Sequence, residues 1–169
     1  MKNYFPYKST STLQKKMLIQ PFFVDQRLKS KKIIKGMGNN YSWSQSAIIK
    51  GIESDLKKGI KNFLLFIVPK EKQKLPENFS YHYEIIRNLK KEFHKDITLL
   101  VDTCLCSITP DGHCGISHKR KIDLNQTHYA LGLAANTYLE AGADIIAPSD
   151  MMKNTTRYLR KRFHDNRYS

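Results

Sequence analysis

The segment ITLLVDTCL (Ile97–Leu105) is a nearly continuous apolar run that gives way to an aspartate, a threonine and a cysteine near its end. Strands that are buried on both faces have this composition, because neither face is left for polar side chains. Three other segments share the pattern: MLIQPFFV (Met17–Val24), NFLLFIVP (Asn62–Pro69) and ADIIAPSD (Ala143–Asp150). We therefore predict four strands of one buried sheet.

Helical patterns separate these strands. Apolar residues recur at spacings of three and four in Ser42–Ile60, Ser80–Phe93 and Leu124–Gly142, and more weakly in Met151–Phe163. We expect Ser42 to cap the first helix and Gly59 to end it. The alternation of strands and helices predicts a parallel sheet with right-handed crossovers. The polar segment Asp25–Tyr41 is then a long loop after the first strand, where such folds place their chemistry.

Composition limits the class of protein. The chain has 169 residues, which suits one domain, and 40% of them are hydrophobic, which suffices for a packed core. The net charge is +14, but the basic residues are spread along the chain and no RNA-binding motif accompanies them. We interpret this charge as a solvated surface and expect no specific nucleic-acid partner. Binding of nucleic acid through charge alone remains the alternative.

The cysteines are confined to one short window. Cys104, Cys106 and Cys114 are the three cysteines of the chain, and their number is odd. The first residues, MKNYFPYKSTSTLQKK, lack the apolar region of a signal peptide, and no run is long enough to span a membrane. We therefore expect a cytoplasmic protein without a membrane partner. In a reducing compartment, clustered thiols are typical of metal or catalytic sites, although inert buried cysteines are the simpler alternative.

The spacing favours a metal site. Cys104 and Cys106 are two residues apart at the end of a predicted strand, so both thiols face the same way. The turn around Gly112 can bring Cys114 back to them. Three thiolates without a fourth protein ligand are typical of a zinc site with an open position. Asp102 shares the strand face of the first two thiols, and His113 adds an imidazole that can donate a hydrogen bond or exchange a proton.

The segment DTCLCSITPDGHCGI (Asp102–Ile116) resembles the zinc-binding segment of the porphobilinogen synthase (5-aminolevulinate dehydratase) family. Other stretches resemble that family in the same order, above all LEAGADIIAPSDMM (Leu139–Met152). The similarity extends from about Lys15 to Met152 and covers roughly the N-terminal half of the family's chain.

The resemblance implies a fold and an activity. The family is a (β/α)8 TIM barrel that condenses two molecules of 5-aminolevulinate into porphobilinogen, an early step toward haem. We therefore expect an α/β protein, a parallel (β/α)4 half-barrel that corresponds to the first half of such a barrel. The expected parts are an N-terminal arm (1–16), the half-barrel (17–163) and a basic tail (164–169). The resemblance assigns Zn²⁺ to Cys104, Cys106 and Cys114, and assigns Asp102, Ser149 and Asp150 to the substrate side.

The resemblance also implies a missing part. The family joins its substrates through imines to two lysines on later strands, and this sequence has no counterpart of those segments. After Met152 the family reads Asp-Gly-Arg, whereas this chain reads Lys153-Asn-Thr-Thr. Lys153 could be a relocated catalytic lysine, but exposed lysines at helix starts are far commoner.

Two readings of the resemblance stay open. One is an enzyme that works only with another polypeptide that supplies the complementary C-terminal half-barrel. The alternative partner is a second copy of the chain in a homo-oligomer, which would close the sheet but bring no lysine-bearing strands. The other is a non-catalytic zinc-binding remnant or decaying gene product. In both, we expect the chain alone to make no porphobilinogen.

Overall fold

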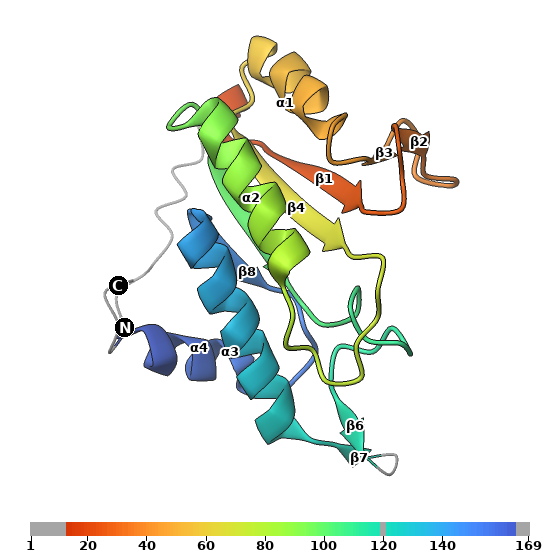
Figure 1. Cartoon of the computed structure of the whole chain (residues 1–169). Coiled ribbons are helices and arrows are strands. Elements are labelled where there is room, and N and C mark those ends of the chain that lie inside the picture. The colour runs from red at the N-terminus through yellow and green to blue at the C-terminus, as the bar shows by residue number, and fades with distance from the viewer. Residues whose placement is uncertain (1–12, 119–120, 165–169) are drawn as a thin grey trace.

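The computed structural model describes residues 13–118 and 121–164, and its core is a six-stranded sheet in the order β2-β3-β1-β4-β5-β8 (Figure 1). The strands are β1 (Ile19–Asp25), β2 (Lys32–Ile33), β3 (Tyr41–Trp43), β4 (Asn62–Val68), β5 (Thr98–Thr103) and β8 (Ile145–Pro148). A separate two-stranded hairpin consists of β6 (Ser117–His118) and β7 (Lys121–Ile122). All pairings in the large sheet are parallel except β2 with β3, so the predicted α/β fold with a mainly parallel sheet is confirmed.

The segment between the first strand and the first helix differs from the prediction. We expected Asp25–Tyr41 to be a loop and Ser42 to cap a helix, but Ser42 lies in β3 and pairs with Phe23 of β1. The expected four-stranded sheet is therefore wrong, because β2 and β3 extend it. Trp43 explains the difference: its ring packs at 5.5 Å from that of Phe22, which buries a large aromatic surface on the sheet.

Four α-helices follow the predicted alternation: α1 (Ile48–Lys57), α2 (Ser80–Phe93), α3 (Leu124–Ala141) and α4 (Thr155–His164). A 3-10 helix, η1 (Lys15–Met17), precedes β1, so the first strand begins two residues later than predicted. Gly59 and Gly142 have positive φ angles of 88° and 106° just beyond α1 and α3, as expected of glycines that end helices. The last helix begins at Thr155 rather than Met151, because the Asp150 side chain holds the residues between them in a turn.

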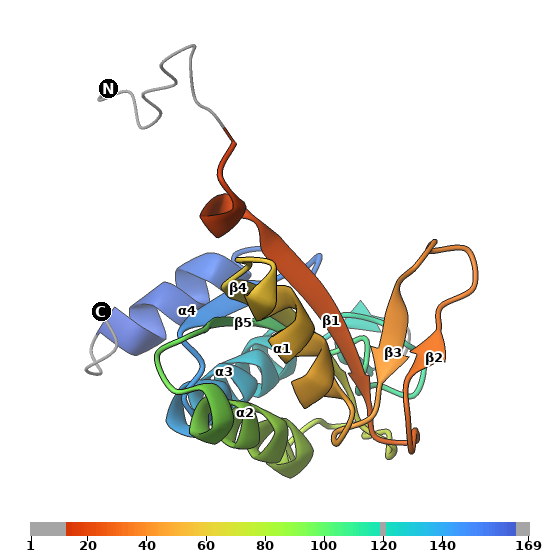
Figure 2. The same cartoon turned by 90° about the horizontal axis from the view of Figure 1, so that it is seen from above.

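The two faces of the sheet differ in their covering. One face packs against α1, α2 and α3, and its side chains, such as Val24, Leu65 and Leu99, are fully buried (Figures 1 and 2). The other face carries Phe23, Leu64, Phe66, Leu100 and Ala147, which are half-buried. Within residues 13–118 and 121–164, none of these five belongs to a buried core cluster.

The two terminal segments predicted from the sequence lie mostly outside the described residues. The predicted N-terminal arm lies outside the described residues except for 13–16, and the basic tail lies outside them except for His164. Among the helices that the structure describes, none combines the length and apolarity needed to cross a bilayer.

Candidate metal centre

The three cysteines converge at the carboxyl end of β5. Their sulfur atoms all lie within 4.8 Å of one another, and no disulfide joins these described residues. Cys104 is buried, Cys114 is half-buried and Cys106 is exposed. A cluster of this kind, closed on one side and open on the other, can hold a metal ion and leave a position for a further ligand.

A turn, rather than strand alternation, brings Cys106 to the cluster. We expected both Cys104 and Cys106 on one face of a strand, but β5 ends at Thr103. Beyond it, the Leu105 carbonyl accepts the backbone N–H groups of Ile108 and Thr109 at 2.8 and 2.9 Å. The convergence was predicted correctly and its geometric reason was not.

Burial controls the acidity of Cys104. The pKa of its thiol is raised well above the ordinary value, chiefly because burial disfavours the charged thiolate. A divalent cation among the three sulfur atoms would stabilise the thiolates and release their protons. The donor set therefore fits a soft or borderline metal ion such as zinc.

Asp102 lies in β5 and is hydrogen-bonded to the residue that follows β8. Its Oδ1 accepts a 2.5 Å hydrogen bond from the Ser149 hydroxyl, just beyond β8. Burial raises the pKa of the Asp102 carboxyl, the bond from Ser149 lowers it, and the nearby Asp150 carboxylate raises it. The two predicted substrate-side residues Asp102 and Ser149 are thus in contact.

One carboxylate oxygen of Asp150 accepts two hydrogen bonds from residues that follow it in the chain. Its Oδ1 accepts the Met152 N–H at 2.9 Å and the Thr155 hydroxyl at 2.6 Å, at the start of α4. Its Oδ2 is buried and has no hydrogen-bond partner among the described residues. Oδ1 of Asp150 therefore stabilises the turn before α4, and only Oδ2 is left for another partner.

His113 is held by its own turn. Its Nδ1 accepts the Gly115 N–H at 2.9 Å, so the neutral ring carries its proton on Nε2. The Asp111 Oδ1 accepts the His113 N–H at 3.1 Å. The side chain is exposed beside Cys114, where Nε2 can donate to a ligand or exchange a proton.

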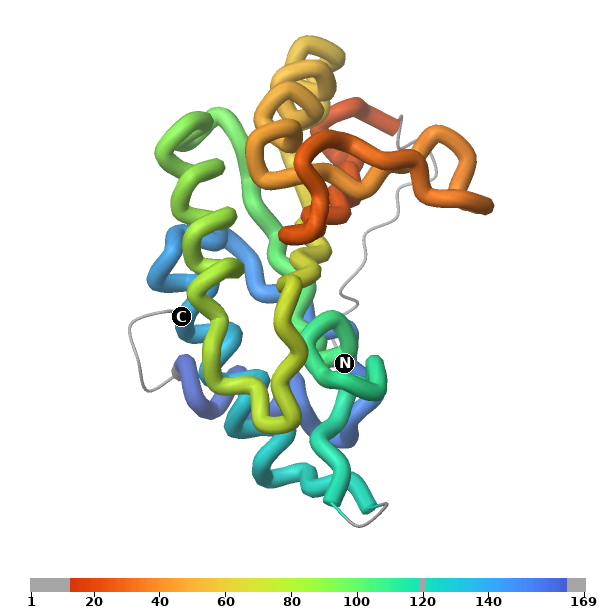
Figure 3. The backbone as a smooth tube through the Cα atoms, turned by 45° about the vertical axis from the view of Figure 1, so that its right-hand side comes forward, coloured from red at the N-terminus to blue at the C-terminus, as the bar shows by residue number. Residues whose placement is uncertain are grey.

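A neighbouring loop supports the cysteine turn. The loop after β4 runs beside the loop after β5 (Figure 3). Within it, the Lys72 ammonium donates to the Ser107 carbonyl, and the Gln73 N–H donates to the Ile108 carbonyl at 2.9 Å. Lys72 was not among the predicted site residues, because one lysine among many carries no local sign of this contact.

Gly115 connects the cysteine segment to the end of β8. A Cβ atom at this position would lie 2.8 Å from the Met152 sulfur and 3.0 Å from Ile122 Cγ2. Such distances are too short for van der Waals contact, so only glycine fits without rearrangement. The two most distinctive segments of the sequence are thus packed against each other.

Comparison with known proteins decides the family. The family model described as delta-aminolevulinic acid dehydratase matches residues 4–169. The chain belongs to the delta-aminolevulinic acid dehydratase family. Membership agrees with the resemblance inferred from the cysteine segment and from Leu139–Met152.

Curated relatives carry the name of the family. A delta-aminolevulinic acid dehydratase of Methanothermus sociabilis is 36% identical over 160 residues, which cover 92% of this chain and 49% of the relative. One of Ruminiclostridium josui is 33% identical, with 90% of this chain and 76% of the relative covered. The chain spans about half the length of the relatives from Methanothermus sociabilis, Archaeoglobus fulgidus and Staphylococcus epidermidis.

A solved structure shares the fold. The delta-aminolevulinic acid dehydratase of Toxoplasma gondii, solved in complex with its reaction product porphobilinogen, superposes with a TM-score of 0.84 at 28% identity. The match covers 93% of this chain and 46% of the Toxoplasma chain. This member of the dehydratase family therefore has the fold of part of a longer relative.

The remaining predicted residue, Lys153, does not join the cluster. It is exposed, and its backbone carbonyl accepts a hydrogen bond from His128 Nε2 at 3.0 Å. A Schiff-base lysine needs a dry pocket that keeps its amine neutral. The exposed position argues against the relocation that sequence analysis considered for this dehydratase-family chain.

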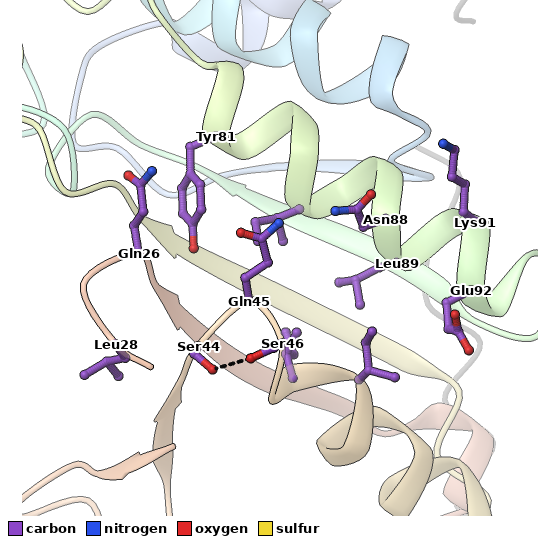
Figure 4. A pocket seen from close by; sticks show the side chains of 13 residues that line it. Gln26, Leu28, Ser44, Gln45, Ser46, Tyr81, Asn88, Leu89, Lys91 and Glu92 are labelled. Atoms are coloured by element: carbon purple, nitrogen blue, oxygen red, sulfur yellow. Dashed lines mark hydrogen bonds between the residues drawn. The ribbon is translucent and has the colours of Figure 1, made fainter. Parts of the chain in front are cut away.

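A separate cavity lies on the helical side of the sheet. It has a volume of about 650 Å³ between α1 and α2 and is lined by Ser44, Gln45, Ser46 and Tyr81, among others (Figure 4). Burial, with the charges of Asp25 and Glu84, raises the pKa of Tyr81 to about 12, so its hydroxyl stays protonated. None of the cysteines lines this cavity, and the candidate centre is distinct from it.

Proposed function

We propose that this chain is the zinc-binding half of an enzyme that condenses two molecules of 5-aminolevulinate into porphobilinogen. The observation that carries the proposal is the convergence of Cys104, Cys106 and Cys114 beside the bonded pair Asp102 and Ser149. Membership of the dehydratase family supports the reaction, and three free thiols suit a reducing, cytoplasmic setting.

The chain's own residues have defined tasks in this proposal. Cys104, Cys106 and Cys114 hold Zn²⁺, which when bound polarises a substrate carbonyl or activates water. Asp102 keeps Oδ1 on the Ser149 hydroxyl, so proton exchange with substrate falls to Oδ2. Its raised pKa suits that exchange, because a carboxyl that is less acidic takes up a proton more readily. His113 presents Nε2 for a second proton transfer.

A second half-barrel is part of the proposal. We propose that residues 17–163 form a (β/α)4 half of a (β/α)8 barrel. Two features support it. Among the described strands, β8 pairs only with β5, so its far edge is free, and β1 pairs with β3 only at Phe23 and Val24, so the first residues of β1 are unpaired on that side. Apolar residues also reach solvent on the sheet face that α1, α2 and α3 do not cover, where Ile19 is 51% and Ile145 is 45% exposed.

The catalytic amine has to come from that second half. In residues 13–118 and 121–163, every lysine is exposed except Lys90, which is half-buried. Lys90 is paired with Asp144 at 2.9 Å, at the opposite end of the strands from the cysteines. The lack of a buried, unpaired lysine among these residues also favours the alternative function, a zinc-binding protein without turnover.

Borohydride trapping distinguishes these functions. We expect the purified chain to bind zinc, to form no reducible imine with 5-aminolevulinate and to make no porphobilinogen. Adding a polypeptide with the part of the Methanothermus sociabilis relative that this chain does not cover is expected to restore both imine and product. Zinc binding without activity in the mixture would favour the non-catalytic alternative. An imine on the chain alone would contradict the need for a second half.

A further inference from the structure

Thr109 lies in the middle of the loop that carries the cysteines. Its side chain is almost entirely buried, with 3% of its surface exposed. Its Oγ1 lies 2.8 Å from the His113 carbonyl oxygen and 3.2 Å from the Leu105 carbonyl oxygen. Its own N–H donates to the same Leu105 carbonyl at 2.9 Å. The hydroxyl proton goes to the nearer acceptor, the His113 carbonyl, and the Thr109 N–H holds the Leu105 carbonyl, so Thr109 connects two parts of the loop that are eight residues apart in sequence.

These two carbonyls belong to neighbours of all three thiols. Leu105 lies between Cys104 and Cys106, and His113 immediately precedes Cys114. The outgoing part of the loop carries two sulfur atoms and the returning part carries the third. A bond from Thr109 to both parts sets how far apart they lie.

We propose that Thr109 is a positioning residue of the metal centre, whose hydroxyl holds Cys114 at the distance that lets all three sulfur atoms bind one ion. The inference rests on the proposed zinc site and extends it beyond the ligands. A buried hydroxyl is costly unless it is bonded, and here its nearer acceptor is the backbone carbonyl of His113, next to the ligand Cys114. Side chains that orient metal ligands in this way typically contribute about 10- to 100-fold to metal affinity.

Thr109→Val tests the inference, because valine keeps the shape of threonine and removes the hydroxyl. We expect zinc affinity, measured by competition with a chromogenic chelator, to fall by about 10- to 100-fold. Bound Co²⁺ is expected to lose part of its thiolate charge-transfer absorbance, as in Cys114→Ser, because Cys114 moves out of reach. The single variant Thr109→Ser keeps the hydroxyl, and we expect its zinc affinity and Co²⁺ absorbance to match those of the unmodified chain.

Thr137→Val is the matched control. The Thr137 hydroxyl also donates to a backbone carbonyl, that of Leu133, at 2.9 Å, but it lies in α3. We expect this variant to bind zinc and Co²⁺ like the unmodified chain. If Thr109→Val does not fold, the pair Thr109→Ser and Thr109→Ala repeats the comparison, since both remove the methyl group and only one keeps the hydroxyl.

The outcomes separate the two proposals. If the unmodified chain binds neither zinc nor Co²⁺, the proposed metal site is wrong, and the role of Thr109 is wrong with it. If the unmodified chain binds zinc and the variant without the hydroxyl matches it in affinity and Co²⁺ spectrum, the metal site stands and the positioning role is overturned. Weaker binding with the Co²⁺ spectrum of Cys114→Ser supports the inference.

Discussion

The hydroxyl of Ser149 donates a 2.5 Å hydrogen bond to Oδ1 of Asp102, although the two residues lie 47 positions apart in the chain. The parallel register of β5 and β8 brings them together, because Asp102 is aligned with Ala147 and Thr103 with Pro148. The bond links β5, the strand that leads into the cysteine turn, to the end of β8, where Ser149 and Asp150 follow.

Removing that bond is expected to make Asp102 less acidic. The Ser149 hydroxyl stabilises the carboxylate and lowers its pKa, whereas burial raises it. Ser149→Ala should therefore raise the pKa of Asp102 further, which a carboxyl-carbon NMR titration of the apo chain measures directly. Ser107→Ala, in the cysteine loop, is the control. An unchanged or lower pKa in Ser149→Ala would show that the bond does not act on the carboxylate.

The same shift has a consequence for stability. Because the folded-state pKa of Asp102 is raised, the folded chain binds the proton more tightly than the unfolded chain. The contribution of this group is fully present below the ordinary aspartate pKa and is lost as pH rises through the raised value. We expect Asp102→Asn to increase the free energy of unfolding at neutral pH and to lose that advantage in acid. Urea denaturation at several pH values measures it, and equal effects at all pH values would contradict it.

Loss of one thiol is expected to weaken zinc binding more than loss of any supporting contact. Cys114→Ser removes one of the three sulfur atoms that lie within 4.8 Å of one another. We expect the zinc affinity to fall by more than about 100-fold, beyond the range for supporting side chains. Acidification is expected to release the metal as the thiolates take up protons. Equilibrium dialysis with zinc checks both effects, with Ser117→Ala as the control, and tight binding by Cys114→Ser would exclude the three-thiol site.

Lys72 is expected to support the cysteine turn from outside. Its ammonium donates to the Ser107 carbonyl, next to Cys106. Lys72→Met should lower zinc affinity by less than about 10-fold, because the exposed Lys72 contacts the backbone beside a ligand and not a ligand side chain. Lys74→Met removes the same charge two residues away and controls for the general effect of a cation. If both variants lower the affinity equally, the effect is electrostatic and the specific contact contributes nothing.

Close packing at Gly115 predicts a coupled pair. Gly115→Ala would place a Cβ atom 2.8 Å from the Met152 sulfur, and we expect a loss of about 1 kcal/mol in the free energy of unfolding, at the lower end for overpacking because the Met152 side chain can move. Met152→Ala removes the obstructing sulfur, so the added Met152→Ala change should recover part of that loss. Urea denaturation of the two single variants and the double variant completes the cycle. Strict additivity would show that the two side chains do not meet.

Much of the sheet and helix pattern could be predicted locally. The apolar run at Asn62–Pro69 became β4, and the three- and four-residue spacing in Ser80–Phe93 matches α2 at both ends. Burial against a sheet needs apolar residues at a fixed period, and that period is written in consecutive residues. The grouping of three cysteines with Asp102 and His113 could also be predicted, because all five residues lie within one short segment of the sequence.

Other features depend on contacts between distant segments. Ser42 lies in a strand because Trp43 packs on Phe22, 21 residues earlier in the chain. This outcome does not follow from helix-like spacing, because a long-range contact outweighed the local preference.

The sequence by itself determined the alternation of buried strands and helices and the identity of the thiols, because residue type and spacing are local properties. Only the tertiary structure decided how those thiols meet. Cys106 reaches Cys104 through a turn that Lys72 supports, Thr109 joins the two parts of the loop, and Ser149 reaches Asp102 across two strands. Hydrogen bonds between such segments form only after the chain has folded and the ends of neighbouring strands are aligned. No pattern of consecutive residues can therefore predict them.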